Sequence, residues 1–270
     1  MRFLKFFLVI AIVLAAVAAG AGIGLRAGRS KFGAVTEVKP DFVAVTNAGF
    51  ITLFAARVAP GPHVVVFDTS LDPQARPVDA LLGALHASRD DITDVFLTHG
   101  HYDHVAGAGV LTKAKLHLGA ADVALAAGQV NPEMLLPMVL GKLLATPPVT
   151  VNAPMTDAAT FEVGAADPTT KLPAKTVKAF PVPGHTAGSF AFLYDGVLVV
   201  GDIMMFKEGR LVTPPRVFDP HPAENTASIL SLKKQLSGET VDVVCTAHGG
   251  CTPKGLGGTL LDDLVSRLGG

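Results

Sequence analysis

Short runs rich in valine and phenylalanine dominate residues 42–69. The runs FVAVT, FITLFAARV and HVVVFDT are separated by NAG and PGP. β-branched and aromatic residues favour extended backbone, whereas glycine, proline and asparagine favour turns. The pattern predicts consecutive antiparallel strands, and therefore the beginning of a sheet.

The hydrophobic period changes after Pro77. Apolar side chains then follow the spacing i, i+3, i+4, i+7, at Val78, Leu81, Leu82 and Leu85. This spacing predicts an amphipathic helix packed against the sheet. Further elements predicted in this half are a strand at TDVFLTH, a helix beyond His104, a strand at KLHLG and a short helix at AADVALAAG.

The second half of the chain repeats this outline. The predicted elements are strands at TVKAFPV, SFAFLY and VLVVGD, a helix over 223–236, a strand at VDVVCTAH, and a last helix marked by Leu256, Leu260, Leu264 and Leu268. Each half therefore combines a sheet with covering helices. Two such halves packed face to face would bury both sheets between outer layers of helix.

Two segments between the halves give weaker patterns. Residues 129–148 are mainly apolar but contain prolines and a glycine, so they predict only one or two helical turns. This segment could be a buried helix, a cap over a substrate pocket, or a surface that touches a membrane. Residues 152–173 predict an irregular connection with one strand at TFEVG.

The amino terminus has a pattern of its own. Arg2 and Lys5 precede residues 6–25, which contain no charged side chain. This run predicts either a signal peptide, cleaved after a small residue near position 18 or 21, or a membrane anchor. We therefore divide the chain into a leader or anchor over 1–30 and a folded domain over 31–270. The folded domain is expected outside the cytoplasm, either exported (periplasmic or secreted) or anchored to a membrane.

Composition narrows the choice of partners. The chain has 22 basic and 23 acidic residues, no tryptophan and two tyrosines. It lacks the basic stripe and the aromatic stacking platform on which nucleic-acid binding depends. The expected partners are a small-molecule substrate and, if the amino-terminal segment is retained, a membrane; the oligomeric state stays open.

Cys245 and Cys251 flank His248 in the stretch VVCTAHGGC. Outside the cytoplasm a disulfide between them is chemically possible. Two cysteines beside a histidine could also bind zinc, but the paired C-x2-C spacing of a structural zinc site is missing. The sequence therefore favours a disulfide or inert thiols over metal-bound thiolates.

Candidate chemistry is concentrated in LTHGHYDHVAG, where His99, His101, Asp103 and His104 fall within six positions. Imidazole and carboxylate groups are common ligands of divalent metal ions. The other candidates are His185 in PGHTAGS, Asp202 in VVGD and His248 in AHGG, each near the end of a strand and close to a glycine. Such positions let side chains project from sheet edges into one cleft.

These ordered motifs, with VVVFDTS upstream, resemble those of the metallo-β-lactamase superfamily over roughly residues 40–252. The resemblance implies an α/β fold of αββα type, a four-layer sandwich. It implies two divalent ions: His99, His101 and His185 hold one, Asp103, His104 and His248 hold the other, and Asp202 bridges them. Zinc is the expected metal, with manganese, iron or cobalt as alternatives. Asp68 matches a residue that orients a ligand histidine.

The expected activity is hydrolysis of an ester, a lactone or a related acyl or phosphoester bond, by a metal-bridging hydroxide with Asp103 as the proton-transferring group. Asp202 disfavours penicillin as the main substrate, because class B β-lactamases have a different arrangement there. Two alternatives stay open: a mononuclear iron enzyme like persulfide dioxygenases, and a membrane-tethered metal-binding protein without turnover.

Overall fold

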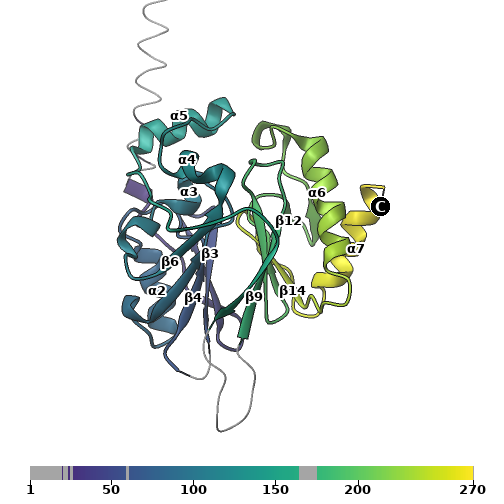
Figure 1. Ribbon diagram of the computed structural model, residues 1–270, viewed down its shortest axis with the longest axis horizontal. Helices are drawn as coiled ribbons and strands as arrows, with labels where there is room; N and C mark the ends of the chain where they lie inside the picture. Colours follow the sequence, from purple (N-terminus) through teal and green to yellow (C-terminus); the bar gives the residue numbers. More distant parts are fainter. Residues whose placement is uncertain (1–19, 21–23, 25–26, 59–60, 164–174, 270) are drawn as a thin grey trace, which may run out of the picture.

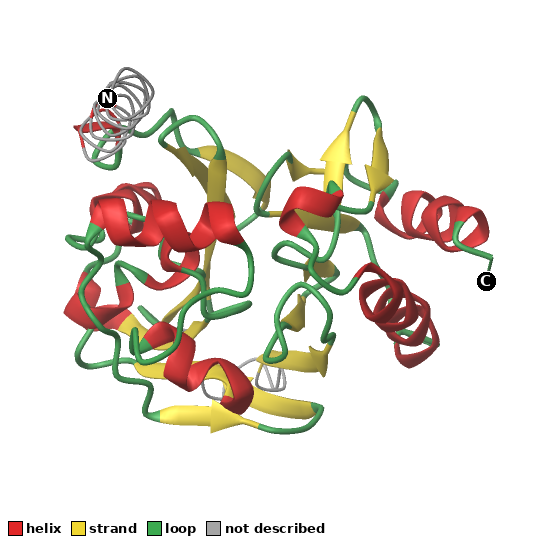
Figure 2. Ribbon diagram, turned by 90° about the horizontal axis from the view of Figure 1, so that it is seen from above, coloured by secondary structure: helices red, strands yellow, loops and turns green. Residues whose placement is uncertain are grey.

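The computed structural model describes residues 20, 24, 27–58, 61–163 and 175–269 as two β-sheets packed face to face between helices. Figure 1 shows α2 on the outer side of one sheet and α6 and α7 on the outer side of the other. The view from above in Figure 2 shows the same order of layers. The predicted αββα four-layer sandwich is therefore confirmed.

The first sheet has seven strands in the order β1-β2-β3-β4-β5-β6-β7. Their bounds are Thr36–Lys39, Phe42–Asn47, Ile51–Arg57, Val64–Phe67, Ile92–Phe96, Lys115–Gly119 and Ala153–Met155. The first four strands are antiparallel neighbours, as their turns predict. Strands β4 to β7 then run parallel, because connections longer than a hairpin join them.

The second sheet has six strands in the order β15-β14-β11-β10-β9-β8. Their bounds are Gly250–Cys251, Val243–Thr246, Val197–Val199, Phe190–Tyr194, Lys175–Pro181 and Ala159–Val163. A separate hairpin joins β12, Met205–Lys207, to β13, Arg210–Val212. We did not predict this hairpin, although its Glu208-Gly209 turn has two residues with positive φ, which is typical of a tight hairpin.

Alternating side chains on each strand fill three apolar layers. On β4, Val64 and Val66 pack with Leu81 and Leu82 of α2, whereas Val65 and Phe67 point into the layer between the sheets. The layer between the sheets also contains aromatic side chains, including Phe192 of the second sheet. A third layer joins the outer face of the second sheet to α6 and α7. The burial of alternate side chains on both faces of each sheet thus stabilises the sandwich.

The helices are α2 (Arg76–Ala84), α3 (Tyr102–Val105), α4 (Val123–Ala126), α5 (Leu135–Leu144), α6 (Pro222–Gln235) and α7 (Gly257–Arg267). Helix α3 includes His104, whereas we expected the helix to begin after this residue. Helix α5 has ten residues, about three turns, so our prediction of one or two turns was too short. Pro137 is tolerated because it lies in the first turn, where backbone N–H groups lack helical partners.

The predicted leader or anchor over 1–30 lies almost wholly outside the described residues and stays a prediction. Among the residues that are described, no helix is both long and apolar enough to span a bilayer. The described chain continues through Arg29, and the Asn47 side chain donates hydrogen bonds to the carbonyl oxygens of Arg29 and Lys31. This attaches the beginning of the folded domain to the β2–β3 turn.

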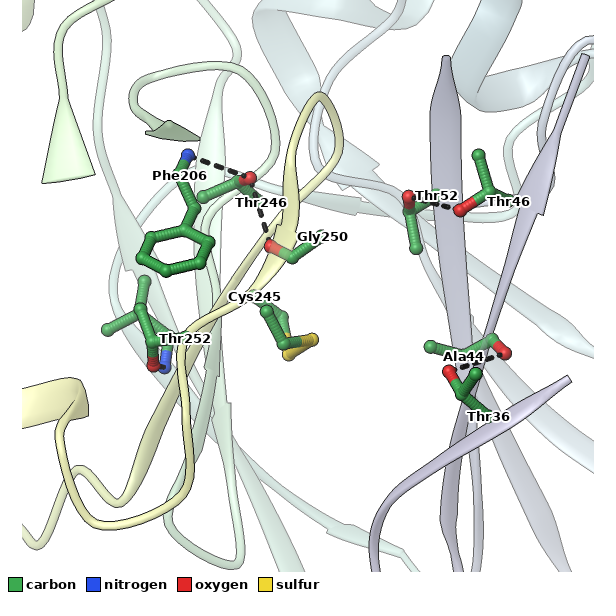
Figure 3. Close-up of a disulfide and its surroundings, with 11 residues drawn as sticks. Thr36, Ala44, Thr46, Thr52, Phe206, Cys245, Thr246, Gly250 and Thr252 are labelled. Atoms are coloured by element: carbon green, nitrogen blue, oxygen red, sulfur yellow. Dashed lines mark hydrogen bonds between the residues drawn. A yellow bond between two sulfur atoms is a disulfide. The ribbon is translucent and has the colours of Figure 1, made fainter. Parts of the chain in front are cut away.

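A disulfide joins Cys245 of β14 to Cys251 of β15, which are directly opposite each other in the ladder. Figure 3 shows this bond in the space between the sheets, across from Thr46 and Thr52 of the other sheet. The Thr246 hydroxyl donates to the Gly250 carbonyl at 3.1 Å. The disulfide and this hydrogen bond close the turn that contains His248.

We expect the paired change Cys245→Ala and Cys251→Ala to lower the free energy of unfolding by about 2 kcal/mol, because the crosslink restricts the unfolded chain. Urea unfolding measures the loss. Reductant should shift the wild-type midpoint to that of the variant and leave the variant unchanged. Equal midpoints for the oxidised wild type and the variant would contradict this.

Candidate metal centre

The candidate residues lie at the carboxyl ends of strands that share a direction within each sheet. In the first sheet, the parallel strands β4 and β5 lead into Asp68 and His99. In the second, the parallel strands β11 and β14 lead into Asp202 and His248, and β9 leads into His185. Loops after parallel strands meet at one edge of a sheet. The face-to-face packing then brings the two edges together.

Three buried imidazoles converge at this edge. The Nε2 atom of His99 lies 2.9 Å from Nδ1 of His101, and Nε2 of His185 lies 3.0 Å from the same Nδ1 atom. The exposed fraction of each residue is 7% or less. Three nitrogen atoms from two loops thus surround one point, which is the arrangement of three protein ligands on a divalent ion.

A second group lies beside the first. Asp103 Oδ2 is 3.9 Å from Nε2 of His104 and 3.7 Å from Nε2 of His248. These three residues also form a set whose ligand atoms lie within 4.8 Å of one another. The site therefore contains two neighbouring sets of ligand-type atoms.

Asp202 lies between the two sets. Its Oδ2 atom is 3.6 Å from Nε2 of His185 and 3.2 Å from Nε2 of His248, and its Oδ1 atom is 3.4 Å from Nε2 of His104. One carboxylate thus reaches a histidine of the first set and two of the second. This is the position that a bridging ligand requires.

Burial and neighbouring charges shift the pKa values in opposite directions. Burial lowers the pKa of His99 and His101 well below the usual value, and the nearby imidazoles act in the same direction. Burial raises the pKa of Asp202, but the neighbouring His248 and His104 lower it well below the usual range. Three imidazoles, including that of His185, are therefore neutral and have lone pairs available.

The second set behaves differently. Burial lowers the pKa of His104 and His248, but the Asp202 carboxylate outweighs it, raising the pKa of His248 to about 9 and that of His104 well above its usual value. The carboxylates therefore need positive charge beside them. Either protonated imidazoles or a divalent cation can supply that charge.

Unpaired buried atoms test whether this set fits a metal. His104 Nε2 and Asp202 Oδ1 are both fully buried and neither has a hydrogen-bond partner. A buried polar atom without a partner costs free energy, and such an exception requires an explanation. His104 already donates from Nδ1 to Asp68, so in the neutral ring, which a bound cation would favour, its Nε2 has a free lone pair directed into the cluster. Donor type and position thus both fit a divalent ion.

Asp68 orients His104, as the resemblance implies. Its Oδ2 atom accepts hydrogen bonds from His104 Nδ1 and from the Thr98 hydroxyl, both at 2.8 Å, and its Oδ1 atom accepts one from the Thr98 backbone at 2.7 Å. Asp68 is fully buried and has a φ of 58°, which is strained for a residue other than glycine. These three hydrogen bonds hold the strained residue in place.

Asp122 is a residue that we did not predict. It follows β6, and its carboxylate accepts hydrogen bonds from the Gly100 backbone at 2.7 Å, the Thr186 hydroxyl at 2.7 Å and the Gly188 backbone at 2.8 Å. Burial raises its pKa, and these hydrogen bonds oppose the rise. A Cβ at position 188 would lie 2.6 Å from the Asp122 carboxyl carbon, so glycine is required there.

Asp122 therefore ties the loop of His99 and His101, which belongs to one sheet, to the loop of His185, which belongs to the other. The only sequence signal was its position after a strand, which it shares with Asp68 and with the ligand candidates. Nothing in its local motif distinguished it from a residue in an ordinary turn.

The remaining side chains near the site have structural contacts. His248 Nδ1 donates to the Phe50 carbonyl at 2.8 Å, and the two rings stack at 5.9 Å between centroids. Tyr102 packs against α5, since a Cβ at Gly141 would lie 3.2 Å from its ring. Tyr102 therefore has a packing role beside the site.

The change Asp122→Asn should weaken metal binding by about 10- to 100-fold, which is typical for partners that orient ligands. An amide cannot accept from all three donors, so one buried N–H or O–H loses its partner. Competition with a chelating dye measures the affinity. Asp90→Asn, at an exposed ion pair with Lys113, is the matched control and should not change it. Equal affinities for both variants would contradict a positioning role for Asp122.

Comparison with known proteins agrees with this geometry. The family model of the "Metallo-beta-lactamase superfamily" matches residues 47–248. A hydroxyacylglutathione hydrolase of Shewanella sp. (strain ANA-3) is 30% identical over 166 residues, which are 61% of this chain and 52% of that protein. The chain thus spans about half the length of this relative.

Two solved structures share the fold at low identity. A subclass B3 metallo-β-lactamase of Bradyrhizobium japonicum has a TM-score of 0.62 at 19% identity, covering 90% of this chain and 94% of that one. A class B3 di-zinc enzyme from an Alaskan soil metagenome has a TM-score of 0.59 at 17% identity, covering 82% and 81%. With the family match over most of its folded part, the chain belongs to the metallo-β-lactamase superfamily of metal-dependent hydrolases.

Proposed function

We propose that this protein is a binuclear metal-dependent hydrolase of small acyl compounds such as esters, lactones or thioesters. The observation that carries the proposal is the convergence of seven ligand-type side chains, five imidazoles and two carboxylates, at one edge of the sandwich. They are His99, His101, Asp103, His104, His185, Asp202 and His248.

Two ions would divide these ligands. His99, His101 and His185 would hold one, Asp103, His104 and His248 the other, and Asp202 would contact both. Zinc suits a site of imidazole and carboxylate ligands, as do manganese, iron and cobalt. Bound there, two such ions would lower the pKa of a water molecule and polarise the carbonyl of the substrate.

The reaction adds the oxygen of water to the acyl carbon and breaks its bond to the leaving oxygen or sulfur. Asp103 is partly accessible, with 14% of its side chain exposed, whereas His104 beside it is fully buried. Its carboxylate can therefore take the proton released by water and return it to the leaving group. Asp68 and Asp122 do not face the substrate; they hold the ligand loops in place.

Two observations support an acyl compound as the substrate: the name of a similar enzyme and the cavity beside the site. The similar Shewanella enzyme is named for a thioester-type substrate, hydroxyacylglutathione. A cavity of about 310 Å³ beside the ligand loop is lined by Tyr102, Leu125 and Met138, among others, and suits an apolar acyl group.

Purified full-length protein, loaded with zinc, manganese or iron, tests the proposal on ester, lactone, thioester, β-lactam and phosphotriester substrates. We expect turnover of at least one acyl substrate, and a loss of at least about 100-fold in kcat/KM for the paired change His99→Ala and His101→Ala, because the loss of partners behind metal ligands alone costs 10–100-fold.

His63→Ala removes an imidazole outside the site and should leave kcat/KM unchanged, which makes it the matched control. Three results would contradict the proposal: no turnover of any substrate, equal turnover by the double variant, or a single bound iron with oxygen uptake. The last of these would favour an oxygenase.

A further inference from the structure

Large apolar side chains are exposed over a short part of the chain before and within α5. The exposed fractions are 52% for Val130, 71% for Leu135, 41% for Leu136 and 38% for Val139. Clustered exposed side chains of this kind mark contact surfaces, whereas single ones are ordinary. We call Leu135, Leu136 and Val139 the outer face of α5.

The other side of α5 is already occupied. Pro137 and Leu144 are buried, Gly141 packs against Tyr102, and Met138 lines the cavity beside the ligand loop. Residues three and four apart share one face of a helix, so the outer face continues from Leu135 and Val139 to the exposed Lys142. In the described part of the chain, nothing covers this face.

The location of α5 relates it to the apolar amino-terminal run. Arg29 donates a hydrogen bond from Nη1 to the carbonyl oxygen of Leu144, the last residue of α5, at 3.5 Å. In the sequence, Arg29 comes only four positions after residues 6–25, the uncharged run. The described chain that follows this run therefore lies, at Arg29, beside the carboxyl end of α5.

We propose that the outer face of α5 lies on the surface of a lipid bilayer, in which residues 6–25 are embedded. Twenty apolar residues match the thickness of a bilayer core. A helix that lies in the interface needs an apolar face bordered by basic side chains, which anionic headgroups attract. Lys142 on α5 and Arg29 at its carboxyl end provide such basic side chains. The inference does not depend on the hydrolase proposal.

The position of the anchor favours a bilayer, rather than a second copy of the chain, as the surface that covers the outer face of α5. An anchor over residues 6–25 would end four positions before Arg29, and would therefore hold the end of α5 near the membrane surface. The exposed leucines therefore meet lipid at high effective concentration before they meet another protein. The apolar face also buries area against acyl chains without requiring a complementary surface.

The test uses the absence of tryptophan from the natural chain. Leu136→Trp places a single fluorophore on the outer face, and Leu256→Trp, at a position of similar exposure, places one beside α7. In Figure 1, α7 lies on the opposite flank of the sandwich from α5. Each full-length variant is reconstituted into vesicles of phosphatidylcholine and phosphatidylglycerol, with or without brominated acyl chains.

We expect brominated lipid to reduce the fluorescence at position 136 at least about twofold, because interfacial helices lie 5–10 Å deep, within reach of the bromine atoms. Fluorescence at position 256 should not change. Adding Leu135→Asp and Val139→Asp to the Leu136→Trp variant should abolish the quenching, although the protein remains on the vesicles.

Two results would overturn the proposal. The first is equal quenching, or none, at positions 136 and 256. The second is a fluorophore at 136 that is shielded from both brominated lipid and aqueous acrylamide, which would mean that protein covers the outer face instead. Circular dichroism of each variant checks that the substitutions leave the fold intact.

Discussion

Two carboxylates and five imidazoles are held within contact distance of each other at the edge where the two sheets meet, mostly out of reach of water. Burying a charged or polar group without a partner costs several kcal/mol. The shortest approaches join ring nitrogens, as between His99 and His101, where one neutral ring can donate its N–H to the lone pair of the other. His101 Nδ1 also faces His185 Nε2, so donor atoms of three rings crowd one centre. The convergence of lone pairs is therefore the constraint around which the edge of the sandwich is built.

Different parts of the sandwich bring these side chains together and hold them there. The apolar layers position strands of both sheets so that their carboxyl ends lie together, and each such end contributes one or a few polar residues. Hydrogen bonds then fix the loops: Asp68 holds the His104 ring and the backbone of Thr98, and Asp122 connects the loops of the two sheets. The Cys245–Cys251 disulfide closes the turn of His248. The candidate ligand side chains are thus fixed by hydrogen bonds and a crosslink although they lie on loops.

Much of the fold followed from hydrophobic pattern alone. Alternation on β4 and the helical spacing of α2 come from burial within a single segment, so both can be read locally. The β12–β13 hairpin and the third turn of α5 were missed because their stability comes from packing: β12 contacts β14, and α5 rests on Tyr102. Pro137 and Gly141 predict a break in an isolated helix. In the folded protein neither residue destabilises α5 much, because Pro137 lies in the first turn and Gly141 packs against Tyr102.

In the candidate site, too, residues in local motifs could be predicted, whereas a residue that acts through distant contacts could not. The seven ligand candidates were found because short motifs pair them with glycines at strand ends, and the structure brings all seven together. Asp122 was missed because its role lies in hydrogen bonds to Gly100, Thr186 and Gly188, which are 22 to 66 positions away along the chain. Contacts at that distance leave no local pattern. The composition of residues 129–148 likewise could not show whether the apolar side chains of α5 are buried or exposed.

We propose that these side chains hold two metal ions. Crystals of the metal-loaded protein, measured at wavelengths on both sides of the metal absorption edge, locate the ions by anomalous scattering. We expect two peaks about 3.5–4 Å apart, as in other two-metal sites. One should lie among His99, His101 and His185, the other among Asp103, His104 and His248, with Asp202 in contact with both. A single peak, or peaks away from these side chains, would contradict the claim.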